Sequence, residues 1–324
     1  MERIRQLIAG LDRWQARHRP AAVAWALQRK FGDDQANLLV VALGWYGFTA
    51  IYPLLLAVVT VLGFIGVRSL GAGLVTTLHQ FPVIGQQFNP SSRHALHGSV
   101  LGLAIGLVGL VYGAQGVTQT AETAMDRVWN VPQLERPGFL PSLLRSLGAL
   151  ATIGGAFLVN ALAGGLATSS GAGGLGERVG IVASQLAVNV GLYLLSFRLL
   201  LAPKAQVPTR RLLPGAAMGA VAFTALITVG TGLIEHQLKN DSATYGAFAS
   251  VIGVVTFLLA LAKLTMYAAE LNPVLANRLY PRALPTTPPR PADDRALEGL
   301  ARQERRRRDE RVGVSFESPA PPSH

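Results

Sequence analysis

The sequence predicts an all-α polytopic membrane protein with six transmembrane helices and both termini in the cytoplasm. Three observations support this: six long apolar stretches, the one-sided placement of arginine, and the overall composition. Half of the 324 residues are hydrophobic and only 15% are charged. This leaves too little polar surface for the two or three soluble domains that such a length would suggest. One transmembrane bundle with cytoplasmic tails therefore describes the chain better.

Six apolar stretches are long enough to cross a bilayer. Each approaches or exceeds the roughly 20 predominantly apolar residues that span a hydrocarbon layer about 30 Å thick. An even number of spans places the two termini on the same side. In chain order the stretches are Asn37–Val67, Gly98–Val117, Leu143–Ala167, Val179–Ala202, Leu212–Ile234 and Ala247–Leu275.

Lysine and arginine lie almost entirely on one side of these stretches. Of the 29 such residues, 24 fall in the two terminal segments and in the second-to-third and fourth-to-fifth connections with their flanks. The opposite connections hold only Arg68, Arg93, Arg178 and Lys239, and Lys263 lies inside the last stretch. Positively charged loops remain in the cytoplasm, so both termini are predicted to be cytoplasmic. The net charge of +11 is then explained by basic segments resting against anionic inner-leaflet headgroups, and no nucleic-acid partner is predicted.

Residues 1–36 are predicted to form cytoplasmic amphipathic helices. Ile4, Leu7, Leu11 and Trp14 recur at helical spacing, with arginines on the remaining surface. Such a helix can lie in the headgroup plane with its apolar face down. It can equally dock on the cytoplasmic end of the bundle.

The two remaining segments are the membrane domain, residues 37–280, and a tail, residues 281–324. Asp33 is placed to cap the first long helix of the membrane domain. The tail is rich in proline and arginine and has few apolar residues, so it is predicted to be a disordered basic segment.

The first two spans carry backbone signals. Pro53 lies inside the first span, where proline removes a donor and kinks a helix. The second span carries glycines spaced 4, 4, 3 and 4 apart on one helical face, which predicts close helix packing. These glycines are Gly98, Gly102, Gly106, Gly109 and Gly113.

A polar stripe follows the second span. Gln115, Gln119, Glu122 and Asp126 are spaced 4, 3 and 4 apart and share one helical face. The stripe is either a solvated helix end or the lining of a cavity that faces the cytoplasm.

The last span holds ionisable residues, which are expensive in a membrane and therefore candidates for function. Lys263, Tyr267 and Glu270 are spaced 4 and 3 apart. A link from Lys263 to Glu270 would span two turns, so a partner on another helix is at least as plausible. The sequence leaves open whether these charges are structural or functional.

Several classes of chemistry are disfavoured. Cysteine is absent, which excludes disulfides and thiolate chemistry. The scattered histidines form no HExxH pair, and no P-loop, GxSxG elbow or dinucleotide fingerprint occurs. The sequence predicts no enzyme, no cofactor and no metal site.

Short motifs in order along the chain resemble the YihY/BrkB family of bacterial membrane proteins. The resemblance covers about residues 29–280. Ala50 stands where the family usually has serine, and Trp45 replaces one tyrosine. The motifs are Phe31 with Asp33 and Asp34, Gly44-Trp45-Tyr46, Tyr52-Pro53-Leu54-Leu55-Leu56, Pro214-Gly215-Ala216, Tyr245-Gly246-Ala247-Phe248 and Ala269-Glu270-Leu271-Asn272.

The resemblance implies a six-span inner-membrane protein tied to envelope integrity, with a role in moving lipid or lipid-linked precursors. It adds Asp34, Tyr46 and Asn272 to the candidate functional residues. The family has also carried a ribonuclease label, which the sequence disfavours because a metal-dependent nuclease needs clustered acidic and histidine ligands. The alternative function is a non-transporting scaffold that recruits envelope partners. A homo-oligomer is also left open.

Overall fold

The computed structural model describes residues 2–65, 100–135, 175–238 and 246–316, with single positions between 138 and 152. Within these residues the fold is all-helical, as predicted. Three short 3-10 helices lie in the connections: η3 (Gln133–Glu135), η4 (Pro203–Ala205) and η5 (Thr209–Arg211). The α-helices are α1 (Glu2–Arg17), α2 (Arg19–Asp33), α3 (Ala36–Ile65), α5 (Val100–Val128), α7 (Leu175–Leu200), α8 (Leu213–Leu238), α9 (Gly246–Ala276) and α10 (Pro291–Gln303).

Five of the predicted apolar stretches coincide with helices, namely α3, α5, α7, α8 and α9. The third stretch, residues 143–167, lies outside the described residues except for single positions. By length and composition, two described segments could cross a membrane: Val182–Leu200 in α7 and Val251–Ala276 in α9. Ala36–Ala50 of α3 and Leu213–Ile227 of α8 are shorter apolar segments. The six-span topology stays a prediction.

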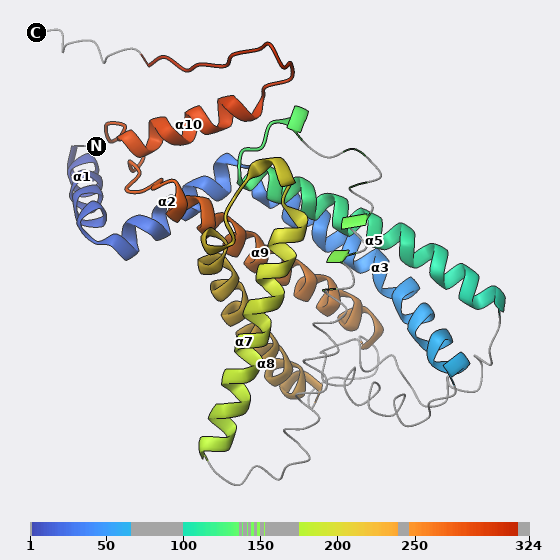
Figure 1. Cartoon of the computed structure of the whole chain (residues 1–324). Coiled ribbons are helices and arrows are strands. Elements are labelled where there is room, and N and C mark those ends of the chain that lie inside the picture. The colour runs from blue at the N-terminus through green and yellow to red at the C-terminus, as the bar shows by residue number, and fades with distance from the viewer. Residues whose placement is uncertain are drawn as a thin grey trace, which may run out of the picture.

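The helices meet at one end of the molecule (Figure 1). There α2 leads from α1 toward the long helices, and α10 lies on the same side as both. α3 packs mainly against α5 and α9, while α8 packs against α7 and α9. The α2 helix also packs against α9, so the N-terminal segment is part of the bundle's end.

Two glycines permit close contacts of α3. A Cβ at Gly44 would overlap the Leu259 side chain of α9, and a Cβ at Gly116 of α5 would overlap the ring of Tyr46. The glycine face predicted for the second span is a different set: Gly98 lies outside the described residues. The surroundings of Gly102, Gly106, Gly109 and Gly113 are not described, so that face stays a prediction.

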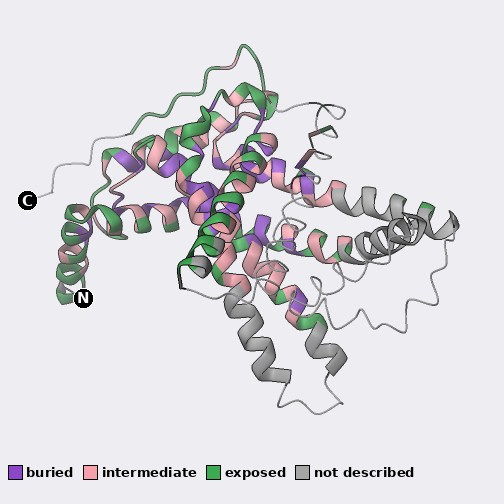
Figure 2. Cartoon of the chain, turned by 60° about the horizontal axis from the view of Figure 1, so that its bottom comes forward, coloured by how far each residue is buried: buried purple, intermediate pink, exposed green. Residues whose placement is uncertain are grey.

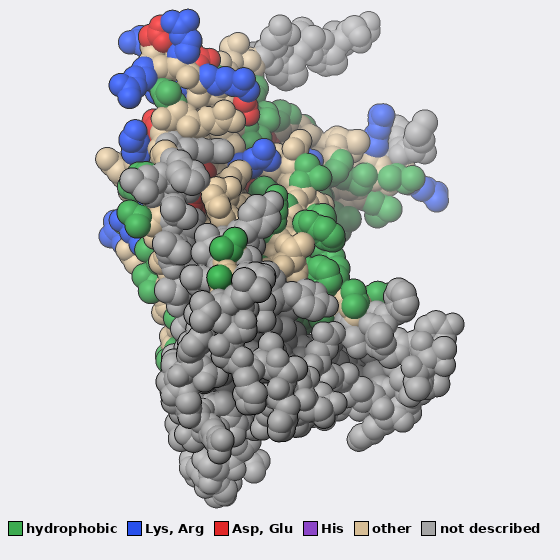
Figure 3. All heavy atoms as spheres, turned by 90° about the vertical axis from the view of Figure 1, so that its right-hand side faces the viewer, with side chains coloured by type: hydrophobic (Ala, Val, Ile, Leu, Met, Phe, Trp, Pro, Cys, Tyr) green, Lys and Arg blue, Asp and Glu red, His purple; other side chains and the backbone are tan. Residues whose placement is uncertain are grey.

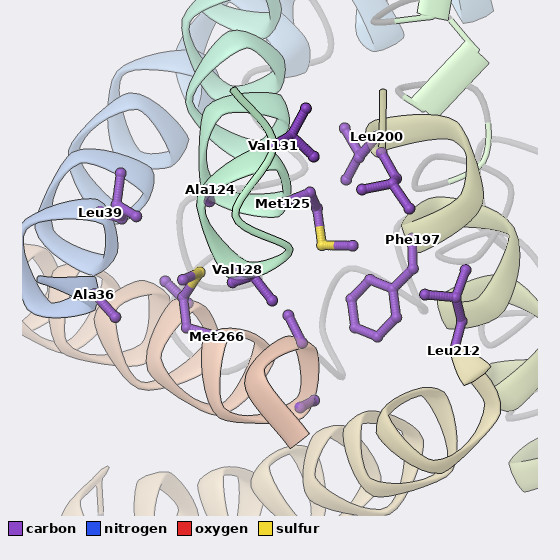
Figure 4. Close-up of a cluster of buried hydrophobic side chains, with 14 of the residues drawn as sticks. Ala36, Leu39, Ala124, Met125, Val128, Val131, Phe197, Leu200, Leu212 and Met266 are labelled. Carbon is purple, nitrogen blue, oxygen red and sulfur yellow. The ribbon is translucent and has the colours of Figure 1, made fainter. Parts of the chain in front are cut away.

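The hydrophobic core lies where the C-terminal parts of α5 and α7 approach α3 and α9 (Figure 4). Met125 and Val128 of α5 lie between Leu39 of α3, Met266 of α9 and Phe197 of α7. Buried positions gather around this junction (Figure 2). This packing fixes α9 relative to its neighbours, and α2 packs against α9, so polar side chains of these two helices meet near the core.

The predicted disordered tail is ordered in part. Residues 291–303 form α10, with Ala292, Asp293 and Ala296 buried. The prediction of disorder over 281–324 is corrected for this segment, because ion pairs and backbone hydrogen bonds replace the apolar core that the segment lacks. Lysine and arginine side chains gather at the end of the molecule that carries α10, and hydrophobic side chains lie on the described surface below them (Figure 3).

Candidate functional site

Three charged side chains are buried together where α2 meets α9. The Lys30 Nζ lies 2.5 Å from Asp34 Oδ2 and 3.3 Å from Glu270 Oε2. Their side chains are 4%, 1% and 0% exposed, respectively. We call Lys30, Asp34 and Glu270 the buried cluster. It contains two carboxylates and one ammonium, so full ionisation would leave one negative charge uncompensated.

Local structure at the end of α2 explains how the cluster forms. Lys30 and Asp34 are four residues apart, which places them on the same helical face. Asp34 follows the last residue of α2, and its N–H donates to the Lys30 carbonyl oxygen at 2.9 Å, while Gln35 N–H donates to the Gly32 carbonyl oxygen at 3.0 Å. Gln35 then takes a positive φ of 52°, which turns the chain into α3. The turn thus holds Asp34 against α9.

The neighbouring carboxylates have a larger effect on the pKa of Lys30 than its burial has. Burial alone would lower the pKa of the Lys30 ammonium, because the charged form is poorly solvated there. The carboxylates of Glu270 and Asp34 outweigh burial and hold the pKa of Lys30 above its ordinary value of 10.5. Lys30 is therefore charged at any physiological pH.

The hydrogen bonding of the two acids is incomplete. Neither Glu270 oxygen has a hydrogen-bond partner, and Asp34 Oδ1 also lacks one. Buried polar atoms are normally satisfied, and each exception calls for an explanation. The buried cluster thus has unused acceptor capacity at a site closed to bulk water.

A second ionic cluster lies next to the first, between the α2 end and the C-terminal segment. Arg282 lies 2.5 Å from Asp33 Oδ2 and 2.9 Å from Asp293 Oδ1. We call Arg282, Asp33 and Asp293 the tail cluster. Backbone N–H groups of Ala283 and Arg290 donate to Asp293 Oδ2 at 3.0 and 2.9 Å. Asp293 also stands in the first turn of α10, where a carboxylate is favoured.

The tail cluster favours its charged forms. Burial would raise the pKa of Asp293, but backbone donors and Arg282 outweigh burial and lower it below its ordinary 3.8. Burial likewise would lower the pKa of Arg282, and Asp293 and Asp33 more than offset this. Asp293 accepts hydrogen bonds from backbone N–H groups, and Asp33 is partly exposed to solvent.

The first helix is bound to the same segment through its polar face. Asp12 pairs with Arg290 and accepts a hydrogen bond from Leu284 N–H at 3.0 Å. Gln15 Nε2 donates to the Arg282 carbonyl oxygen at 2.7 Å. Burial would raise the pKa of Asp12, but the hydrogen bonds from Arg290, Leu284 and Gln15 lower it. The α1 helix is therefore docked by polar contacts, not by its apolar stripe.

Two further contacts of α9 align it with its neighbours. Asn272 Oδ1 accepts a hydrogen bond from Gly215 N–H at 2.7 Å, where a Cβ would clash with the Ala268 carbonyl oxygen. Tyr267 Oη donates to Gln28 Oε1 at 2.7 Å, and its ring stacks on Phe31 with centroids 4.2 Å apart. Asn272 thus ties α9 to α8, and Tyr267 ties it to α2 beside the buried cluster.

A protein-family model described as "Virulence factor BrkB" matches residues 27–293, which is most of the chain. The chain belongs to the BrkB family. No curated protein and no solved structure matches it. Membership of the BrkB family indicates an integral membrane protein. The matched segment contains every residue of the buried cluster and of the tail cluster.

This BrkB-family chain brings several predicted site residues together. Asp34 and Glu270 share the buried cluster, while Tyr267 and Asn272 contact the adjoining helices. Asp33 is the last residue of α2 and binds Arg282, which corrects the prediction that it caps the first long helix.

Other predicted residues lie elsewhere. Lys263 is exposed, whereas Glu270 of the same helix is fully buried, so the two share no site. Tyr46 packs on Gly116 and is 40% exposed. Pro53 lies within α3, but its side chain is not among those described, and the predicted kink is untested.

The residues of the polar stripe on α5 are not all exposed to solvent. Gln119 is exposed and Gln115 half-buried, whereas Glu122 and Asp126 are buried. Asp126 Oδ1 accepts the Ala202 N–H at 3.1 Å and so joins α5 to the chain beyond α7. At Asp126 the stripe therefore has a structural contact.

The sequence patterns do not single out the basic partners, Lys30 and Arg282, or the acids Asp12 and Asp293. Lys30 enters the prediction only as one of the basic residues that set the topology. Its spacing of four residues from Asp34 was the available signal. Arg282 pairs with Asp33, and Asp12 with Arg290, across more than 200 residues of chain, and no local pattern marks such pairs. Asp293 lies only 11 residues from Arg282, but a loop separates the two.

Proposed function

We propose that this BrkB-family protein is a six-span, multi-pass protein of the bacterial inner membrane with cytoplasmic termini. It moves a lipid or another amphiphilic substrate and so supports envelope integrity. The proposal is supported by the one-sided distribution of arginine and by the five predicted stretches that coincide with helices.

The observation that carries the transport proposal is the buried cluster. Replacing a buried ion pair by apolar side chains is often neutral or stabilising, so such a group adds little to stability. Ionisable groups at the end of a membrane helix are costly and mark pathways for ions or substrates. Glu270 lies in α9, one of the helices long enough to cross a membrane. A charged site here suits a headgroup, while the apolar helices around it suit acyl chains.

The α1 helix supports contact with lipid. Ile4, Leu7, Leu11 and Trp14 are 54–68% exposed, although the opposite face of α1 is bound to the protein. Arginines flank this apolar face, as expected for a helix that rests on an anionic inner leaflet. Brominated lipids should quench the fluorescence of Trp14 in the full-length protein, measured as the difference from the Trp14→Phe variant.

The experiment is a lipid-translocation assay in proteoliposomes. Wild-type protein should expose a labelled inner-leaflet phospholipid to an external quencher faster than protein-free liposomes do. Glu270→Gln should slow translocation at equal protein density. Glu298→Gln is the matched control, because Glu298 is exposed on α10. Wild-type rates equal to those of protein-free liposomes would rule out lipid translocation.

The alternative is a non-transporting scaffold that recruits an envelope protein or a second copy of itself. One observation favours the scaffold: the buried cluster joins α2 to α9, and the Asn272–Gly215 hydrogen bond joins α8 to α9, so these polar contacts hold the three helices in a fixed arrangement. A scaffold would leave translocation at the protein-free rate, and partners would be captured by crosslinking in the membrane.

A further inference from the structure

The second carboxylate of the buried cluster lacks the solvent and the hydrogen-bond donors that stabilise the second carboxylate of the tail cluster. Both contain one cation and two carboxylates. In the tail cluster, the second carboxylate is satisfied by backbone donors, and Asp33 is 26% exposed to water. In the buried cluster, Glu270 is fully buried and both its oxygens lack a hydrogen-bond donor. An ionised Glu270 would thus be a buried charge that shares a single ammonium, 3.3 Å away, with the closer Asp34.

We propose that Asp34 and Glu270 hold one exchangeable proton between them, and that the buried cluster is a proton-binding site. This deepens the proposed function, on which its physiological role rests, by naming the proton as the ion that the transporter would carry.

The distances from Lys30 to the two carboxylates indicate which acid carries the proton. Lys30 Nζ lies 2.5 Å from Asp34 and 3.3 Å from Glu270, so Asp34 is the ionised partner of Lys30. Glu270 lies farther from Lys30 and has no hydrogen-bond donor to either oxygen, so Glu270 is the acid that carries the proton. Glu270 interacts with Asp34 as well as with Lys30, and Asp34 Oδ1 is an acceptor without a donor. A proton on Glu270 can therefore be shared with Asp34.

The surrounding charges leave this assignment intact. Asp33 faces Arg282 in the tail cluster, and Arg210 and Arg211 of η5, which packs against α9, are exposed. Arg29 precedes Lys30 and is half-buried, and no ion pair among the described residues joins it to the cluster. Glu122 and Asp126 are buried on α5, which also packs against α9, and Asp126 accepts the Ala202 N–H. Lys30 and Asp34 are the charged groups that act on Glu270.

A proton fits this site better than a metal ion. Cations bound by oxygen need about six or more ligands, as the calcium and magnesium sites show. The described residues contain no group of three acidic or histidine side chains that could hold a metal. The Lys30 ammonium already contacts both carboxylates and would repel a second cation.

Infrared spectroscopy of the full-length protein in lipid nanodiscs tests the proposal, because the C=O stretch of a protonated carboxyl is distinct from carboxylate bands. At pH 7, wild type should show this band, and it should fall as pH rises. Glu270→Gln should lose the band. Asp34→Asn should also lose it, because Glu270 then ionises as the partner of Lys30. Asp293→Asn, in the tail cluster, should keep it.

Absence of the band in the wild type, or its persistence in Glu270→Gln, would overturn the proposal. Loss of the band when NaCl replaces choline chloride at constant pH would also overturn it, in favour of a sodium site. The wild-type titration needs no variant, so it decides the question even if a substitution prevents folding. The readout needs no substrate either, so a failed translocation assay and a failed proton site are separate results.

Discussion

The buried cluster and the tail cluster use the same charges in different ways. Each surrounds one cation with two carboxylates, and they lie side by side because Asp33 and Asp34 are neighbours in sequence. Asp33 turns toward Arg282 and water, while Asp34 turns toward Lys30 and α9. Solvent and backbone N–H groups stabilise two negative charges in the tail cluster. The buried cluster has neither, which is why one acid there is assigned a proton.

The comparison separates charges that hold a structure from charges that are available for chemistry. Arg282 attaches the C-terminal segment to the end of α2 through Asp33, and Asp293 accepts hydrogen bonds from Arg282 and from the Ala283 N–H. Glu270 remains incompletely satisfied at the end of an apolar helix. Perturbed, poorly satisfied groups of this kind occur at functional sites more often than elsewhere.

The largest expected effect is the loss of the buried cation. Lys30→Met leaves two acids without their ammonium, and removal of one partner from a buried ion pair costs about 3–5 kcal/mol. We expect a loss of this size at pH 7 in unfolding of the purified protein by SDS. The loss should shrink at lower pH, where both acids can take protons. Lys204→Met is the matched control, because Lys204 is exposed.

Removing the cation of the tail cluster should cost less. In Arg282→Met, Asp33 still reaches water and Asp293 keeps two backbone donors, so we expect about 1–3 kcal/mol. The loss should show in the same SDS titration. An effect as large as that of Lys30→Met would contradict the distinction between the two clusters.

The pH dependence of the tail cluster follows from Asp293. Its folded pKa is below the ordinary 3.8, so its carboxylate stabilises the fold above that value. The stabilisation is lost as pH falls through the lower folded pKa. Asp293→Asn should therefore reduce the unfolding temperature by a few degrees at pH 7 and flatten its decline below pH 4. A parallel decline in wild type and variant would contradict the role of Asp293.

The smallest expected effect is that of Glu270→Gln on stability. If Glu270 carries the proton, glutamine replaces one neutral group by another, and the free energy of unfolding should change by no more than about 1 kcal/mol. A loss of about 3 kcal/mol or more in the SDS titration would mean that Glu270 is an ionised partner of Lys30. Translocation should fall in this variant while stability is retained.

Much of the fold could be predicted from the sequence. The helical class follows from apolar stretches whose backbone groups must be satisfied internally in a membrane. Glu270 was identified as a candidate because an ionisable group is conspicuous within an apolar stretch, and Asp34 was identified through the family resemblance. The partner of Glu270 could not be read, since Lys263 is nearer in sequence but exposed, whereas Lys30 lies 240 residues away.

The sequence by itself determined the composition of the helices, the one-sided distribution of arginine and the presence of acids near membrane helices. Those features are local, and they follow from hydrophobicity and charge along the chain. Only the tertiary structure decided which acid meets which base, and which of them reaches water. The α2–α3 turn sends Asp33 to one cluster and Asp34 to the other, and that choice depends on packing against α9 and α10. The difference in solvation then decides which cluster can release a proton.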